Sequence, residues 1–169
     1  MRATRALGHD NGNPNVTGNR SGSTRKVAVD TFRDDPMFPR IERVVAELLH
    51  KGNVVAPVDV IIGMGLLRRE HLDDWRRGRV PYLERVIDCN LTRLSRLLRI
   101  LRFHAHDLNL KPSVTVYMRR GKGPKQRLRF TKTGDAKLEQ AYSTHLMWPG
   151  KRPFHSPPSD PDLPTSPAS

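Results

Sequence analysis

The chain has one cysteine and no long apolar run, and each of these two shortages excludes a class of protein; aromatic residues make up only 6%. Cys89 alone cannot build a disulfide framework within the chain or an all-cysteine zinc site, which suits a reducing compartment. The longest apolar stretch, residues 54–67, contains Pro57 and Asp59 and falls short of the roughly 18 apolar residues that span a membrane. The N-terminus lacks the apolar segment of a secretory signal. We therefore expect a cytoplasmic protein without a membrane partner.

Acidic residues are also scarce, and this shortage indicates the kind of partner. Lys and Arg number 30 and Asp and Glu 17, so the 169-residue chain carries a formal net charge of +13. Hydrophobic residues make up 36% of the chain, which is lean but sufficient for a folded domain. A strong basic excess favours binding to a polyanion.

Composition divides the chain into a folded unit and two tails. Residues 1–35 are rich in Gly, Asn, Ser and Thr, and residues 149–169 hold seven of the fourteen prolines. Such segments cannot bury enough apolar surface to fold, so both are predicted to be disordered. Residues 36–148 are predicted to form one helical nucleic-acid-binding domain with a β-hairpin.

Apolar residues recur with the helical period through most of that unit. One helix is predicted from near Pro39 to a stop at Gly52, and a long one follows Asn90, a favourable N-cap. After the long helix the period changes from 3.6 to 2, which indicates strands. The fold class is therefore mainly α (α+β), a compact helical domain with one basic C-terminal β-hairpin. The other predicted helices cover residues 57–64 and 69–77, a segment that begins at 81, and 133–142, where Thr133 is the expected cap.

The predicted hairpin has one apolar and one basic face. Val114, Val116 and Met118 alternate with polar residues, and Leu128 and Phe130 do so beyond the glycine-containing turn at 121–124. These five apolar side chains are expected to face the core together. Cations would then occupy the turn and the outer face, where a wing would meet phosphates.

Most of the excess charge lies in the long helix and the hairpin. Residues 90–132 contain twelve basic residues and one acid, a net charge of +11, and the remaining residues sum to only +2. In the long helix the arginines are expected to form the whole outer face, opposite the leucines. The alternative interpretation is an ordinary solvated helix face. The residues predicted to bind nucleic acid are Arg76, Arg77, Arg79, Arg93, Arg96, Arg99, Arg102, Tyr117, Arg119, Arg120, Lys122, Lys125, Arg127 and Arg129.

Residues 58–81 have the proportions of a helix-turn-helix. A short apolar helix and a second helix flank a glycine-containing turn, and the second helix ends in W-R-R-G-R-V-P. This ending resembles the W-x-x-G-R-x-P close of helix-turn-helix domains of the phage-repressor and MerR/excisionase kinds. The resemblance implies that the second helix reads DNA, with Arg76, Arg77 and Arg79 near the groove. Three acids on that helix (Glu70, Asp73 and Asp74) depart from the pattern, and the alternative is a plain helical hairpin with Trp75 in the core.

No residue pattern assigns a catalytic group, a metal or a cofactor. Asp135 and Glu139 share a helix face, with His145 beyond, and two such carboxylates could hold Mg²⁺ for a nuclease. Helix capping is the simpler interpretation of the same acids. His104 and His106 point to opposite sides of a helix and cannot share a metal ion.

The sequence therefore predicts a small nucleic-acid-binding protein, with DNA preferred to RNA as the partner, in the manner of a winged-helix or helix-turn-helix regulator. RNA binding is one alternative, because arginine-rich helices and basic hairpins also suit RNA. An adaptor that docks an acidic protein is a second, and a Mg²⁺-dependent nuclease is a third. A homodimer would suit a groove reader, but no pattern indicates one.

Overall fold

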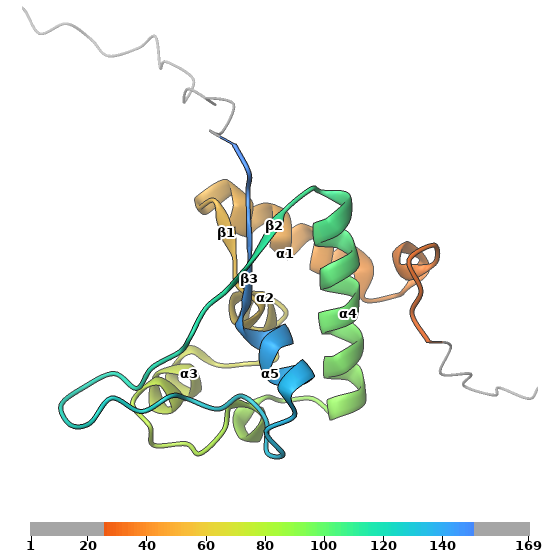
Figure 1. Ribbon diagram of the computed structural model, residues 1–169. Helices are drawn as coiled ribbons and strands as arrows, with labels where there is room; N and C mark the ends of the chain where they lie inside the picture. Colours follow the sequence, from red (N-terminus) through yellow and green to blue (C-terminus); the bar gives the residue numbers. More distant parts are fainter. Residues whose placement is uncertain (1–25, 151–169) are drawn as a thin grey trace, which may run out of the picture.

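Five α-helices and a small antiparallel sheet make up residues 26–150, the part of the chain that this computed structural model describes (Figure 1). The mainly helical α+β class is thereby confirmed. Of the predicted disordered tails, only residues 26–35 and 149–150 fall within this range. The elements, in chain order, are η1 (Phe32–Asp34), α1 (Phe38–Lys51), β1 (Val54–Val55), α2 (Pro57–Gly63), α3 (Arg69–Arg76), η2 (Leu83–Val86), α4 (Leu91–Asp107), β2 (Lys111–Val114), α5 (Ala136–Ser143) and β3 (Thr144–Met147).

The sheet joins three short strands that lie far apart in the sequence. Its order is β1-β3-β2, and both pairs are antiparallel. Leu146 of β3 lies opposite Val55 on one side and Pro112 on the other. Strand β3, the last in residues 26–150, therefore occupies the centre of the sheet and ties the C-terminal part of the domain to α1 and α2.

Three helices end in the same hydrogen-bonded motif. The residue after each C-cap has a positive φ: 72° at Gly65, 75° at Gly78 and 56° at Asn109. In each case the next backbone N–H reaches back to the helix, as Arg79 N does to Asp74 O at 2.9 Å. These Schellman motifs satisfy terminal carbonyls and turn the chain sharply. The sequence predicted that two of these helices end just before Gly65 and Gly78. The predicted N-cap at Asn90 is also confirmed, because its side chain accepts from Arg93 N at 2.8 Å.

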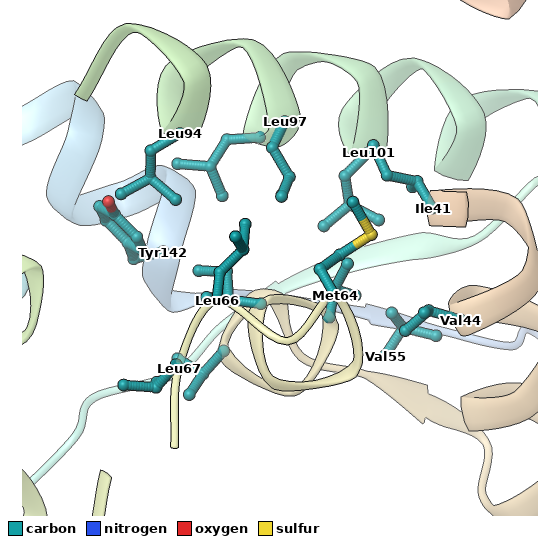
Figure 2. Packing of buried hydrophobic residues seen from close by; sticks show 14 of the residues in the cluster. Ile41, Val44, Val55, Met64, Leu66, Leu67, Leu94, Leu97, Leu101 and Tyr142 are labelled. Carbon is teal, nitrogen blue, oxygen red and sulfur yellow. The ribbon is translucent and has the colours of Figure 1, made fainter. Parts of the chain in front are cut away.

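The core lies where α1, α2 and α4 meet the sheet (Figure 2). Ile41 of α1, Val55 of β1 and Leu97 of α4 are fully buried there. Burying one such side chain stabilises the fold by about 1.5–3 kcal/mol. Phe32 is buried as well, so the core includes a residue that precedes the boundary expected at residue 36.

Two details of the predicted helices were wrong. The segment after Pro81 forms only a single 3₁₀ turn, η2, because Leu83 N and Glu84 N donate to the carbonyls of Arg129 and Phe130 instead of continuing a helix. The last helix is capped by Asp135, two residues after Thr133. The Asp135 carboxylate accepts from the backbone N–H groups at 137 and 138, each at 3.0 Å.

The hairpin is present, but its first strand faces the other way. Met118 and Arg127 form the bridge, with Arg119 N donating to Gln126 O and Leu128 N to Tyr117 O, both at 2.8 Å. This register puts Tyr117 on the same side as buried Leu128, and Met118 on the same side as Arg127. The predicted inward positions of Val114, Val116 and Met118 were therefore wrong, because the ring of Tyr117 takes the place next to the core.

Candidate nucleic-acid interface

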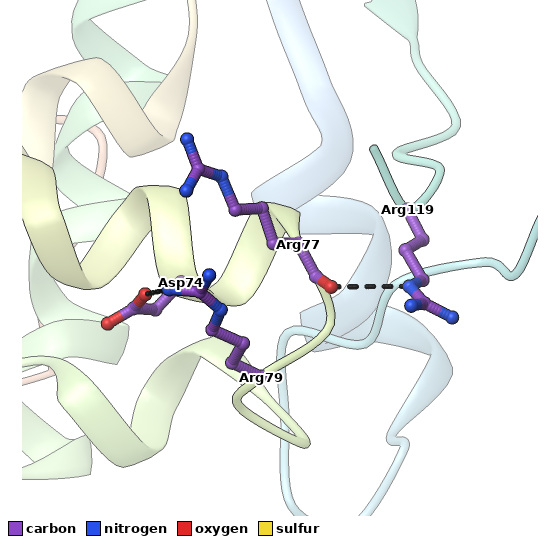
Figure 3. A network of polar contacts seen from close by, with 4 residues as sticks. All are labelled: Asp74, Arg77, Arg79 and Arg119. Carbon is purple, nitrogen blue, oxygen red and sulfur yellow. Dashed lines mark hydrogen bonds and ion pairs between the residues drawn. The ribbon is translucent and has the colours of Figure 1, made fainter. Parts of the chain in front are cut away.

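The hairpin docks onto the end of α3 and joins two basic segments. Arg120 N donates to Arg76 O at 2.7 Å, and the Arg119 guanidinium donates through Nε to Arg77 O at 3.2 Å (Figure 3). Both acceptors are carbonyls at the C-terminal end of α3, which attract cations. The two segments are therefore held together by the peptide backbone as well as by side chains.

The turn after α3 makes this approach possible. Gly78 has a positive φ of 75°, and a Cβ built on it would lie 3.0 Å from Cδ of Arg119. Glycine provides both the left-handed conformation and the room for the arginine. The W-R-R-G-R ending thus serves a structural purpose: Trp75 is buried, and its indole Nε1 donates to Arg129 O at 2.7 Å.

Two glutamates hold the returning strand of the hairpin. The Glu139 carboxylate accepts from Thr131 N and Thr131 Oγ1, each at 2.8 Å, and from Phe130 N at 3.1 Å. Glu84 accepts from Lys132 N at 3.4 Å, just beyond that strand, and from the Tyr142 hydroxyl of α5 at 3.1 Å. Hydrogen bonds to a charged acceptor are the stronger ones. The base of the hairpin is therefore fixed, although one bridge is all the regular pairing found between its strands.

Tyr117 lies in an aromatic cluster and does not stand free beside the cations. Its ring packs 5.6 Å from Trp75 and 5.1 Å from Phe130, measured between centroids. Its hydroxyl is 2.6 Å from His145 Nε2. Burial, with a smaller contribution from Asp59, raises the pKa of Tyr117 to about 12. The ring therefore stabilises the hairpin through these contacts.

Seven of the predicted cations gather where α3 meets the hairpin, and we call this group the hairpin end. Five of them are exposed, whereas Arg76 and Arg119 are partly buried. The group carries one ion pair with a carboxylate among residues 26–150: Arg79 binds Asp74 at 3.0 Å (Figure 3). The uncompensated charges repel one another unless an external anion neutralises them. The members of the hairpin end are Arg76, Arg77, Arg79, Arg119, Arg120, Lys122 and Lys125.

The outer face of α4 is not entirely arginine, contrary to the prediction. The η1 segment and α1 cover part of it, so that Ile100 is fully buried and Phe103 packs 5.8 Å from Phe32. Arg96 is bound to Asp35, whose side chain is only 3% exposed. Of the predicted arginines on α4, Arg93, Arg99 and Arg102 have no carboxylate partner among the described residues.

Two hollows flank α5, between the hairpin and α4. One, of about 500 Å³, is lined by Val114, Arg127 and Arg129, and the other, of about 420 Å³, by Arg102 and Lys137. Gln140 borders both. The hairpin tip itself projects away from α4 (Figure 1). The structure therefore divides the predicted basic surface into the hairpin end and α4, with α5 and Lys137 between them. The sequence reasoning did not single out Lys137.

The residues considered for catalysis have other partners. Asp135 caps α5, Glu139 binds the hairpin strand and His145 binds Tyr117. Within residues 26–150, no three His, Cys, Asp or Glu side chains are grouped so that they could hold a metal ion. Burial raises the pKa of the Cys89 thiol, which disfavours the reactive thiolate.

Comparisons with known proteins do not assign the chain to a family. No protein-family model, curated protein or solved structure matches the chain. Among the described residues, every helix is too short or too polar to cross a bilayer.

Proposed function

We propose that this protein binds nucleic acid, with duplex DNA as the preferred partner, and that the hairpin end is its main contact surface. Arg99 and Arg102 on α4 form a second contact region. Affinity comes chiefly from phosphate neutralisation, since every proposed contact is a cation and Arg79 alone among them pairs with a carboxylate within residues 26–150.

The observation that carries this proposal is the joining of α3 to the hairpin. The bonds from Arg119 and Arg120 to the α3 carbonyls bring together cations that are more than forty residues apart in the sequence. Only one of the seven is paired with a carboxylate among residues 26–150. A surface that contacts only solvent does not require cations from two segments to lie together. A row of phosphates does require several cations on one surface.

The order of elements supports a winged-helix arrangement. A long helix, α4, directly precedes β2, and the hairpin lies within the connection from β2 to the central strand β3. If the domain is aligned with a winged helix, α4 corresponds to the recognition helix. The segments α3 and η2 are then an insertion before it, and the hairpin is an enlarged wing. The interpretation of α3 as the recognition helix is less favourable, because Glu70 and Asp73 are exposed on it and would face phosphate.

A salt titration of DNA binding tests the proposal. Each phosphate contact contributes a slope of about −0.9 in log K against log salt, so four to eight contacts give a slope of about −4 to −7. Replacing Lys122 and Lys125 by glutamate removes two cations from a turn where neither makes an ion pair within the described residues. We expect the double variant to bind at least tenfold more weakly, with a slope shallower by about 2.

A matched control separates the site from the overall charge. Arg43 and Lys51 are exposed on α1, and their replacement by glutamate changes the net charge equally. This control should retain most of the affinity. Equal losses in both double variants, or a flat titration, would overturn the proposal. Tighter binding to a matched RNA duplex than to DNA would identify RNA as the preferred partner.

A further inference from the structure

The outward face of the hairpin carries a row of exposed apolar side chains beside a row of arginines. Val114 is 60% exposed, Val116 55% and Met118 40%. Alternate residues of an extended segment share a face, so these three form one row. The bridge places Met118 opposite Arg127, and Arg129 follows two residues later on the same side of its strand. We call these five residues the outer hairpin face.

This face differs chemically from the hairpin end. Nucleic-acid contact requires cations and polar groups, but it does not require three aliphatic side chains in water. Exposed aliphatic rows typically mark sites of protein association, where arginine is also enriched. The face continues into the hollow of about 500 Å³ beside α5, which Val114, Arg127 and Arg129 line, so a bound segment would have a recess for a side chain.

The charge of the face defines its partner. Neither Arg127 nor Arg129 pairs with a carboxylate among residues 26–150, and Arg129 donates only to the carbonyl of Lys132 at 3.0 Å. Glu139 also lines the hollow, but its carboxylate is occupied by Phe130 and Thr131. A second copy of this chain would bring like charges together. The partner must therefore supply the carboxylates.

We propose that the outer hairpin face binds an acidic amphipathic helix of another protein. Residues i and i+4 of a helix lie about 6 Å apart along its axis, which is close to the spacing of about 6.8 Å between alternate residues of a strand. A row of apolar side chains at i and i+4 would lie along Val114, Val116 and Met118. Carboxylates on the neighbouring row would reach Arg127 and Arg129.

The test uses the full chain and two synthetic peptides of one composition. In the first, leucines form one helical row flanked by glutamates, and in the second the same residues are placed evenly around the helix. We expect the first peptide to bind at least tenfold more tightly and to shift the NMR signal of the Met118 methyl group. Equal binding of both peptides would mean general charge attraction and would overturn the proposal.

Variants separate this face from the nucleic-acid surface. V116S together with M118S should weaken binding of the first peptide at least tenfold and leave DNA affinity unchanged. V29S together with L91S is the matched control, because Val29 and Leu91 are 59% and 57% exposed but lie outside this face. Unchanged peptide affinity in V116S/M118S, or self-association of the wild type that this double variant abolishes, would overturn the assignment to an acidic helix. A wild-type chain that binds the first peptide but does not bind DNA would count only against the nucleic-acid proposal.

Discussion

The Tyr117 hydroxyl and His145 Nε2 lie 2.6 Å apart and join the hairpin to the central strand of the sheet. Their rings also meet edge to face, with centroids 5.6 Å apart. Tyr117 belongs to the segment that leads to the cationic tip, and His145 is in β3. This contact therefore couples the position of the proposed interface to the rigid part of the domain.

Tyr117→Phe should lower the free energy of unfolding by about 1 kcal/mol, the usual contribution of one hydrogen bond. The ring keeps its place beside Trp75, so the fold survives. Urea unfolding followed by tryptophan fluorescence measures the change. Tyr82→Phe is the control, since the hydroxyl of Tyr82 has no hydrogen bond among the described residues, and it should cost less. An equal loss in both variants would contradict the importance of the Tyr117–His145 bond.

Stability should fall as the pH drops below the ordinary histidine range. Burial lowers the pKa of His145 and of His104, partly offset by nearby carboxylates. Around pH 6.5 and below, the unfolded chain takes up protons that the folded histidines bind less readily, so the stabilisation present at higher pH is lost on acidification. Urea unfolding at pH 7.5 and 5.5 measures this. The double variant His104→Gln/His145→Gln should show a smaller loss than the wild type, and an unchanged loss would assign the effect to other groups.

Features set by short-range rules were predictable from the sequence. The stops at Gly52 and Gly78, the cap at Asn90 and the burial of Trp75 follow from local patterns, and all are present. The sheet was not predicted, because β1 is two residues long and β3 follows α5 without a break. Such strands have no periodicity of their own, and partners distant in the sequence define them.

The faces of the hairpin and of α4 show how tertiary contacts override a periodic pattern. Val116 and Tyr117 are both suitable for burial, and alternation alone could not decide between them. The cluster of Trp75, Phe130 and His145 selects the larger ring. On α4, the arginine stripe was visible in the sequence, but the neutralisation of Arg96 depends on Asp35, which lies 61 residues away in the chain.

Glu139 and Asp135 should differ in their contributions to stability. Glu139→Ala leaves the backbone N–H groups of Phe130 and Thr131 without their acceptor and should cost about 2–3 kcal/mol. Asp135→Ala removes only an N-cap and should cost about 1 kcal/mol. Thermal unfolding of both variants measures the difference. Millimolar Mg²⁺ should leave the wild-type unfolding temperature unchanged, and a clear rise would revive the metal-dependent alternative.

Arg96 and Arg99 are three residues apart on α4 but should respond in opposite ways to replacement by glutamine. Arg96→Gln leaves the buried Asp35 carboxylate with Met37 N as its remaining donor, at 2.9 Å, and should cost about 2 kcal/mol of stability. It should change DNA affinity little, because this arginine is already neutralised. Arg99→Gln should change stability by less than about 0.5 kcal/mol and make the salt slope shallower by about 1, since its charge is available to a phosphate. Urea unfolding and DNA titration of both variants provide the four measurements, and a larger loss of affinity in Arg96→Gln than in Arg99→Gln would exclude Arg99 from the interface.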